Sequence, residues 1–153
     1  MITVTNRTEI AVAADVVFAY VSDFSNNATW QSGIASTTWT TPPPIRVGST
    51  YDQVTDHKVA TTIHEITAID PGRSITTESR HGAAIPSTVT RTVESLGADR
   101  CRITVELTAY PRGLRRLTTP LLRRVVRKSV AADYRRLKRI LEKEHGSRTD
   151  QDS

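Results

Sequence analysis

The last third of the chain carries an apolar stripe that recurs every three or four residues, which is the spacing of one face of an α-helix. Thr118 and Thr119 followed by Pro120 are typical of a helix start, because a hydroxyl caps the first N–H groups and proline fits the first helical position. We predict one long helix over residues 119–143, with arginines and lysines on its other side, and a shorter helical turn over 112–118. The stripe consists of Leu121, Val125, Val126, Val130, Tyr134, Leu137 and Leu141. Such a helix must cover a large apolar surface elsewhere in the chain.

Residues 34–110 have the composition of β-strands and hold 16 of the 23 threonines. Threonine alternates there with isoleucine and valine, which indicates strands with one wet face and one buried face. The breaks between the candidate strands are short and contain proline, glycine or aspartate. Short breaks favour antiparallel hairpins, because parallel strands need long crossovers. We expect strands over 34–41, 49–56, 58–69, 73–80, 87–96 and 100–109.

The N-terminal segment supplies the remaining elements. Residues 3–10 predict a strand, residues 14–22 a short helix with a crowded apolar face, and residues 28–31 a second short helix. The order is one strand, two short helices, six strands and one long helix, which is an α+β arrangement. A curved antiparallel sheet of about seven strands offers one large apolar surface, its concave face. We therefore expect the C-terminal helix to lie across that face and to enclose a pocket.

Length and charge suggest one domain with a basic helix. The 153 residues fit one domain over 1–145, followed by a polar tail over 146–153 that we expect to be disordered. Residues 112–145 contain twelve of the 21 lysines and arginines but only three of the 16 aspartates and glutamates. Because the sheet needs the apolar stripe, we expect a solvated basic face and at most transient membrane contact. The basic side lacks interleaved aromatic residues, so no nucleic-acid binding is expected.

Several classes of protein are disfavoured by what the sequence lacks. The N-terminus has neither the basic start nor the apolar run of a signal peptide, and we expect a soluble cytoplasmic protein. Cys101 is the single cysteine and shares a strand face with Ile103 and Val105, which predicts a buried small hydrophobic residue. Histidine or cysteine pairs with metal-ligand spacing and glycine-rich phosphate loops are absent from the sequence, so no metal and no cofactor are predicted.

Catalytic residues cannot be assigned from these motifs. The sequence contains no Gly-x-Ser-x-Gly, the motif that presents a nucleophilic serine. His57 beside a turn and His145 near the C-terminal end are expected in solvent. His64 inside a strand and His81 at the expected pocket mouth are weak candidates for a general base.

Five residues are candidates for contact with a ligand. Arg91 shares strand parity with Val89 and Val93, which would direct it at the concave face, where a buried arginine must be paired or must meet an anion. The alternative is that Arg91 extends past the sheet edge into water. Its candidate partners are Glu78 with Arg80, or Glu106. The proposed wall consists of Trp30, Tyr51, Gln53, Arg91 and Tyr110, with Trp39 as a further aromatic candidate, and ordinary core packing is the alternative for the aromatic residues.

Four stretches of the sequence occur in an order found in a known family. They are Val16–Phe24 with Trp30, Val47–Tyr51, Ile66–Arg73 and Leu122–Lys138. Together they resemble the START-like helix-grip superfamily (SRPBCC), and the last stretch resembles its bacterial polyketide cyclase/dehydrase-like branch. The resemblance covers residues 3–143 and implies the helix-grip fold, in which a curved sheet grips a long C-terminal helix. The matching residues are scaffold residues, and no catalytic motif is carried over.

The fold leads to an expected function with two alternatives. We expect a small hydrophobic or amphipathic ligand, of lipid, polyketide or isoprenoid type, in a cavity between the long helix and the sheet. The first alternative is a cyclase- or dehydratase-like enzyme that uses the same cavity. The second is a protein-interaction module without a ligand. The sequence predicts no oligomeric state.

Overall fold

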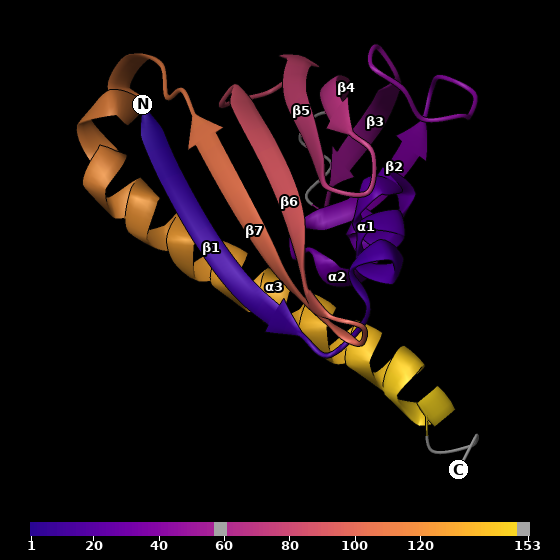
Figure 1. Cartoon of the computed structure of the whole chain (residues 1–153). Helices are drawn as coiled ribbons and strands as arrows, with labels where there is room; N and C mark the ends of the chain where they lie inside the picture. Colours follow the sequence, from indigo (N-terminus) through magenta and orange to yellow (C-terminus); the bar gives the residue numbers. More distant parts are fainter. Residues whose placement is uncertain (57–60, 150–153) are drawn as a thin grey trace.

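The computed structural model describes residues 1–56 and 61–149. Its elements follow the predicted order (Figure 1). The strands are β1 (Ile2–Ile10), β2 (Ile34–Trp39), β3 (Thr50–Thr55), β4 (Thr61–Asp70), β5 (Ser74–His81), β6 (Ser87–Gly97) and β7 (Arg100–Ala109). The helical elements are α1 (Ala14–Ser22), the 3-10 helix η1 (Phe24–Asn26), α2 (Asn27–Trp30), the 3-10 helix η2 (Gly113–Thr118) and α3 (Thr119–Thr149).

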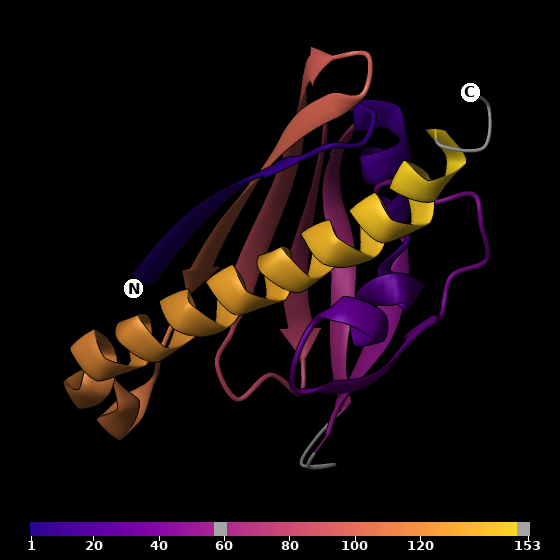
Figure 2. The ribbon, with the colours of Figure 1, turned by 90° about the horizontal axis from the view of Figure 1, so that it is seen from below.

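The seven strands form one sheet in the order β1-β7-β6-β5-β4-β3-β2, and every neighbouring pair is antiparallel. β2 to β7 are therefore a meander, as the short breaks predicted. β1 completes the sheet beside β7, with Ile2 opposite Ala109 and Ile10 opposite Cys101. The sheet is strongly curled, and α3 crosses its concave side (Figure 2). These features confirm the predicted α+β helix-grip fold.

Helix α3 begins at Thr119, as predicted, but continues beyond residue 143 to Thr149. Gly146 does not end it, because one glycine inside a helix costs only about 1 kcal/mol relative to alanine. Residues 150–153 of the expected tail lie outside the described part of the chain. So does His57, and so does the expected start of the strand at residue 58.

Part of the predicted apolar stripe of α3 faces solvent instead of the sheet. Tyr134 and Leu137 are buried against the sheet as predicted, but Leu121 is 66% exposed and Val125 is 56% exposed. At about 100° of rotation per residue, the side chains of Leu121 and Leu137 point in directions that differ by about 160°. In this half of the helix the residues that face inward are Leu122 and Val126, which pack on Ile2, Val4 and Ala109.

The core divides into two main clusters. The larger lies between α1, α3 and strands β6 and β7, and it includes Trp30, Ile103, Tyr134 and Leu137. Cys101 belongs to it and is fully buried, as predicted, and burial raises the pKa of its thiol. The second cluster joins Phe24 and Tyr51 with Ile66 and Ile75 of strands β4 and β5. The space between these two clusters is the position of the candidate site.

Candidate functional site

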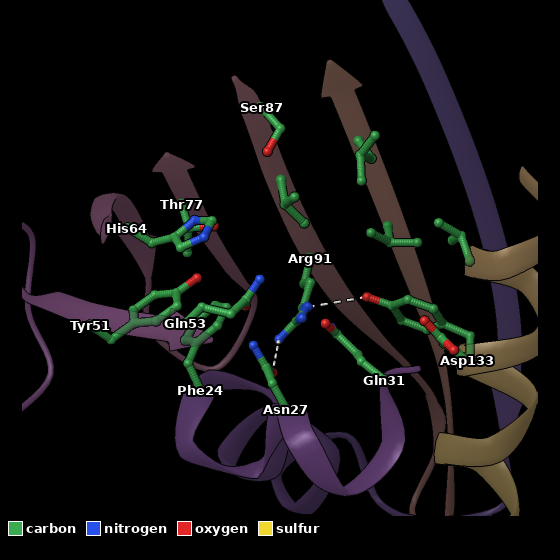
Figure 3. A pocket seen from close by; sticks show the side chains of 15 residues that line it. Phe24, Asn27, Gln31, Tyr51, Gln53, His64, Thr77, Ser87, Arg91 and Asp133 are labelled. Carbon is green, nitrogen blue, oxygen red and sulfur yellow. Dashed lines mark hydrogen bonds between the residues drawn. The ribbon is translucent and has the colours of Figure 1, made fainter. Parts of the chain in front are cut away.

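A cavity of about 190 Å³ lies between the two core clusters, bounded by η1, α2, strands β3 to β7 and α3 (Figure 3). Its wall mixes apolar and polar side chains from opposite ends of the sequence. They are Phe24, Asn27, Gln31, Tyr51, Gln53, His64, Thr77, Ser87, Val89, Arg91, Val105, Leu107, Val130, Asp133 and Tyr134. The strands contribute residues of one parity, because alternate side chains of a strand point to the same face.

Arg91 of β6 points into this space and is only 3% exposed. Its Nε–H donates to the hydroxyl of Tyr134 at 3.1 Å, and its Nη1 donates to the carbonyl of Val21 at 2.9 Å and to Oδ1 of Asn27 at 3.3 Å. The guanidinium carbon also lies 4.7 Å from the ring centroid of Phe24 and 4.9 Å from that of Trp30. Hydrogen bonds and cation–π contacts thus hold the charge in place.

None of the carboxylates in the described residues forms an ion pair with Arg91. Glu78 is instead bound to Arg80 at 3.1 Å, and Glu106 is exposed, so neither predicted partner reaches Arg91. Asp133 is the one acidic residue among those that line the cavity, and its Oδ1 accepts from the backbone N–H and the hydroxyl of Ser32 at 3.0 and 2.8 Å. The hydrogen-bond acceptors of the buried guanidinium are therefore all neutral. Because Arg91 is buried, the alternative that it extends past the sheet edge into water is wrong.

A stack of three rings forms the opposite wall. Tyr51 stacks on Phe24 with centroids 4.8 Å apart and on His64 with centroids 5.0 Å apart. Burial raises the pKa of Tyr51 to about 12 and lowers the pKa of His64 to about 4, so both side chains are neutral near pH 7. Nε2 of His64 is buried and has no hydrogen-bond partner in the part of the chain that the structure describes. A ligand hydroxyl or carbonyl could supply one.

The structure brings three of the five predicted ligand contacts together, since Tyr51, Gln53 and Arg91 all line the cavity. Trp30 is fully buried behind it, with its ring edge-to-face on Tyr134 at 5.0 Å. Tyr110 is 44% exposed at the end of β7 and does not line the cavity. That these residues bind a ligand stays a prediction.

Other residues discussed from the sequence have different places. Trp39 packs edge-on against Phe24 and Tyr51, and its Nε1–H donates to Oδ1 of Asp23 at 2.9 Å. His81 is exposed and His145 is half-buried rather than exposed, and neither lines the cavity.

Sequence reasoning missed Asn27, Gln31, Asp133 and Tyr134 as parts of the wall. Asn27 directly precedes the short helix predicted over residues 28–31, and Tyr134 belongs to the predicted apolar stripe. One signal was available for α3: Asp133 is an acidic residue at the centre of a basic, apolar helix and directly precedes the aromatic residue of the stripe. For Asn27 and Gln31 no pattern in the sequence indicates the cavity.

The described residues contain neither a cluster of metal ligands nor a membrane-spanning helix. Within residues 1–56 and 61–149, no three histidine, cysteine, aspartate or glutamate side chains gather where they could hold a metal ion. No helix of the same residues is both long enough and apolar enough to cross a membrane.

Comparison with known proteins gives one family and many structural neighbours. The sequence model of the polyketide cyclase/dehydrase and lipid transport family matches residues 1–142. No curated protein matches the chain in sequence. A START superfamily protein from Mycobacterium smegmatis is similar in structure, with a TM-score of 0.80, 15% identity, and coverage of 94% of this chain and 99% of that one.

Two aromatase/cyclases have the same fold. Zhui from Streptomyces sp. R1128 aligns with a TM-score of 0.70 and 16% identity, over 92% of this chain and 93% of its own. The di-domain protein BexL of the BE-7585A biosynthetic pathway aligns with a TM-score of 0.75 and 14% identity, over 93% of this chain and 47% of its own. At these identities the likeness concerns the fold.

Proposed function

Because the chain belongs to the polyketide cyclase/dehydrase and lipid transport family, which implies hydrophobic ligand binding, we propose that its cavity holds a compact amphipathic ligand of lipid, polyketide or isoprenoid type. The apolar part of the ligand packs between the aromatic stack and Val89, Leu107 and Val130. A carbonyl, carboxylate or phenolate oxygen of the ligand accepts from Arg91.

The observation that carries this proposal is the burial of Arg91 without a carboxylate partner. A buried charge is costly unless it is paired, and a hydrogen bond to a charged group contributes about 1.5–3 kcal/mol. Tyr134, Val21 and Asn27 supply only neutral acceptors to the guanidinium. A ligand with an anionic oxygen would complete the shell of Arg91, and the orphaned Nε2 of His64 offers the ligand a second polar contact.

The size of the cavity limits the part of the ligand that it can enclose. An apolar cavity of about 150 Å³ binds benzene. The cavity here has about 190 Å³ and therefore fits one or two rings, or a short acyl segment. A larger ligand would have to extend beyond this space.

The pKa values weigh against the enzymatic alternative. A general acid or base works best when its pKa lies near the working pH. The pKa of His64 is lowered to about 4 and that of Tyr51 is raised to about 12, so both lie far from neutrality. Binding is therefore better supported than proton transfer by His64 or Tyr51. A retained ligand that changes mass during incubation would favour the enzyme.

The test compares two probes of the same shape, 2-naphthoate and neutral 2-naphthamide, by titration calorimetry. We expect Arg91→Gln to weaken naphthoate by about 1.5–3 kcal/mol and naphthamide much less. Arg135→Gln removes the same charge from an exposed position of α3 and is the matched control. Equal losses for both probes in Arg91→Gln would mean that the arginine is purely structural.

Native mass spectrometry of freshly purified protein complements the titration. A retained small molecule would support the proposal and identify the ligand. If the protein retains nothing, binds neither probe and co-purifies with another polypeptide, the interaction-module alternative is correct.

A further inference from the structure

A second feature of the molecule lies outside the cavity, at η2 and the first turns of α3. Four large apolar side chains are exposed there: Leu114 is 84% exposed, Leu117 81%, Leu121 66% and Val125 56%. Only four other large apolar side chains are exposed in the described residues, namely Met1, Val47, Leu96 and Tyr110. The η2–α3 patch is defined by two sets of residues. Its apolar residues are Leu114, Leu117, Leu121 and Val125, and its basic residues are Arg112, Arg116, Arg123, Arg124, Arg127 and Lys128.

The charge of this region has one sign. Between Leu107 and Ala132 the sequence has seven lysines and arginines and no aspartate or glutamate. Within the described part of the chain, the six basic residues of the patch form no ion pair, whereas Arg80, Arg100, Arg102 and Lys138 elsewhere do. The patch is therefore a block of uncompensated positive charge beside exposed leucines.

The geometry places apolar and basic side chains on one outward surface. Leu121, Arg124, Val125 and Lys128 follow the spacing of one helix face, while Leu122 and Val126 face the sheet. η2 and the start of α3 form the end of the molecule away from α1 and α2 (Figure 2). Arg123, Arg124, Arg127 and Lys128 also line a hollow beside Thr119 and Pro120. Arg123 and Arg127 flank this face, each about 160° around the helix from Leu121 and Val125 respectively.

We propose that the η2–α3 patch docks the protein on the surface of an anionic lipid bilayer. The leucines enter the boundary between headgroups and acyl chains, and the arginines and Lys128 lie among the lipid phosphates. An amphipathic helix with leucine on one side and arginine on the other has this behaviour, and each basic residue near an anionic surface strengthens partition by about fivefold. The sequence argument against such contact was that the sheet needs the apolar stripe, but the sheet covers Leu122 and Val126 rather than Leu121 and Val125.

A bilayer fits the patch better than an acidic protein. The four apolar side chains are spread over two elements, and the adjacent hollow is lined by basic and small residues rather than by an apolar groove. A protein partner needs pockets of matching shape for its anchor residues, whereas a bilayer adapts to any outline.

The patch is also close to the cavity. Val130 lines the cavity and follows Val125 by five residues, which is about 7.5 Å along the helix axis. Docking would hold the cavity near the bilayer surface. The inference stands on the patch alone and holds whatever the cavity binds.

The experiment is co-sedimentation of the full chain with vesicles of phosphatidylcholine, with and without phosphatidylglycerol. We expect binding only to the anionic vesicles, and weaker binding as salt rises. Arg124→Gln with Lys128→Gln, on the same helix face as Leu121 and Val125, should weaken it by about 25-fold, from fivefold per residue. Arg135→Gln with Arg139→Gln removes the same charge from exposed positions of the same helix outside the patch and should weaken it less than about threefold, because screening acts over roughly 10 Å.

The leucines separate insertion from simple charge attraction. Leu117→Ser with Leu121→Ser, both at exposed positions, should abolish most of the binding without changing the melting temperature. The proposal is wrong if anionic vesicles are not bound, if the two charge-removing double variants lose equal affinity, or if the leucine double variant binds like the wild type. It is also wrong if inorganic phosphate at constant ionic strength displaces the vesicles, or if soluble poly-glutamate binds as tightly as they do.

Discussion

Arg91 shows how a single side chain determines the character of the cavity. Its position on β6 directs it inward between two valines, and its three hydrogen bonds join β6 to the end of α1, to α2 and to α3. The alternation of the strand predicted the inward direction, because side chains of one parity share a face. The partners could not be predicted, because they lie 43 to 70 residues away in the sequence.

The hydroxyl of Tyr134 should contribute measurably to stability. In Tyr134→Phe the buried Nε–H of Arg91 loses its acceptor, and an unsatisfied buried donor costs about 1–3 kcal/mol. Urea unfolding at pH 7 measures the loss. Tyr110→Phe is the matched control, because Tyr110 is exposed and outside the cavity. Equal stability of Tyr134→Phe and the wild type would show that this hydrogen bond contributes nothing.

His64 should make stability depend on pH. Its pKa is lowered to about 4 by burial, from an ordinary value of 6.5, so the unfolded chain binds a proton more readily than the folded one. The contribution of neutral His64 is complete above pH 6.5, falls as the pH drops toward 4, and is constant below that. Linkage predicts that stability at pH 5 is lower than at pH 8 by about 2 kcal/mol from this residue.

Urea unfolding of the wild type and of His64→Gln at both pH values tests this prediction. The wild type should lose about 2 kcal/mol more than the variant between pH 8 and pH 5. The carboxylates contribute equally to both proteins, so the difference isolates the imidazole. Parallel pH profiles would mean that the imidazole of His64 takes up a proton in the folded state as easily as in the unfolded state.

At the scale of elements, the two halves of α3 pack against different parts of the molecule. Its C-terminal half is gripped by the sheet through Tyr134, Leu137 and Leu141, while its N-terminal half contacts β1 through Leu122 and Val126. The sequence predicted the helix and its start correctly, because the cap, the proline and the apolar spacing are local signals. Near the start it correctly included Val126, but it omitted Leu122 and included the exposed Leu121 and Val125. Both Leu121 with Val125 and Leu122 with Val126 have helical spacing. Only the position of the sheet decides between them.

A pair of substitutions measures this difference between the two faces. Leu137→Asp should unfold the domain, because an unpaired buried carboxylate costs several kcal/mol out of a total stability of about 5–15 kcal/mol. Leu121→Asp should change stability by no more than about 0.5 kcal/mol, because that side chain is in solvent. Circular dichroism during heating follows both. Unchanged stability in Leu137→Asp would contradict the packing of α3 on the sheet.

At the scale of the whole molecule, the sequence was a good guide to the architecture and a partial guide to the site. Short turns and alternating threonines favour an antiparallel meander. The apolar side of one long amphipathic helix must be buried, and the concave face of the sheet is the large apolar surface available, so few other arrangements fit. The cavity is different, because it exists where η1, α2, five strands and α3 converge. Strand alternation puts Arg91 on an inward parity and puts Tyr51 and Gln53 on one common face of their strand. Asn27 and Tyr134 become wall residues only through tertiary contacts. Tyr110 follows the last strand and ends in solvent, which no alternation rule could show.

Because several elements meet at the cavity, a bound ligand should stabilise them together. Saturating 2-naphthoate, at about 100 times its dissociation constant, should stabilise the protein by about 2.7 kcal/mol and raise the melting temperature by roughly 5–10 °C. Hydrogen exchange should slow together in α2, in β6 and in the middle of α3, because Arg91 joins all three. It should not slow in η2, because none of the described side chains of η2 lines the cavity. In Arg91→Gln the slowing should be smaller in all three elements at the same fractional occupancy, since the side chain that joins them is shortened. Slowing confined to η2, or no change in melting temperature at saturation, would place the binding site elsewhere on the molecule.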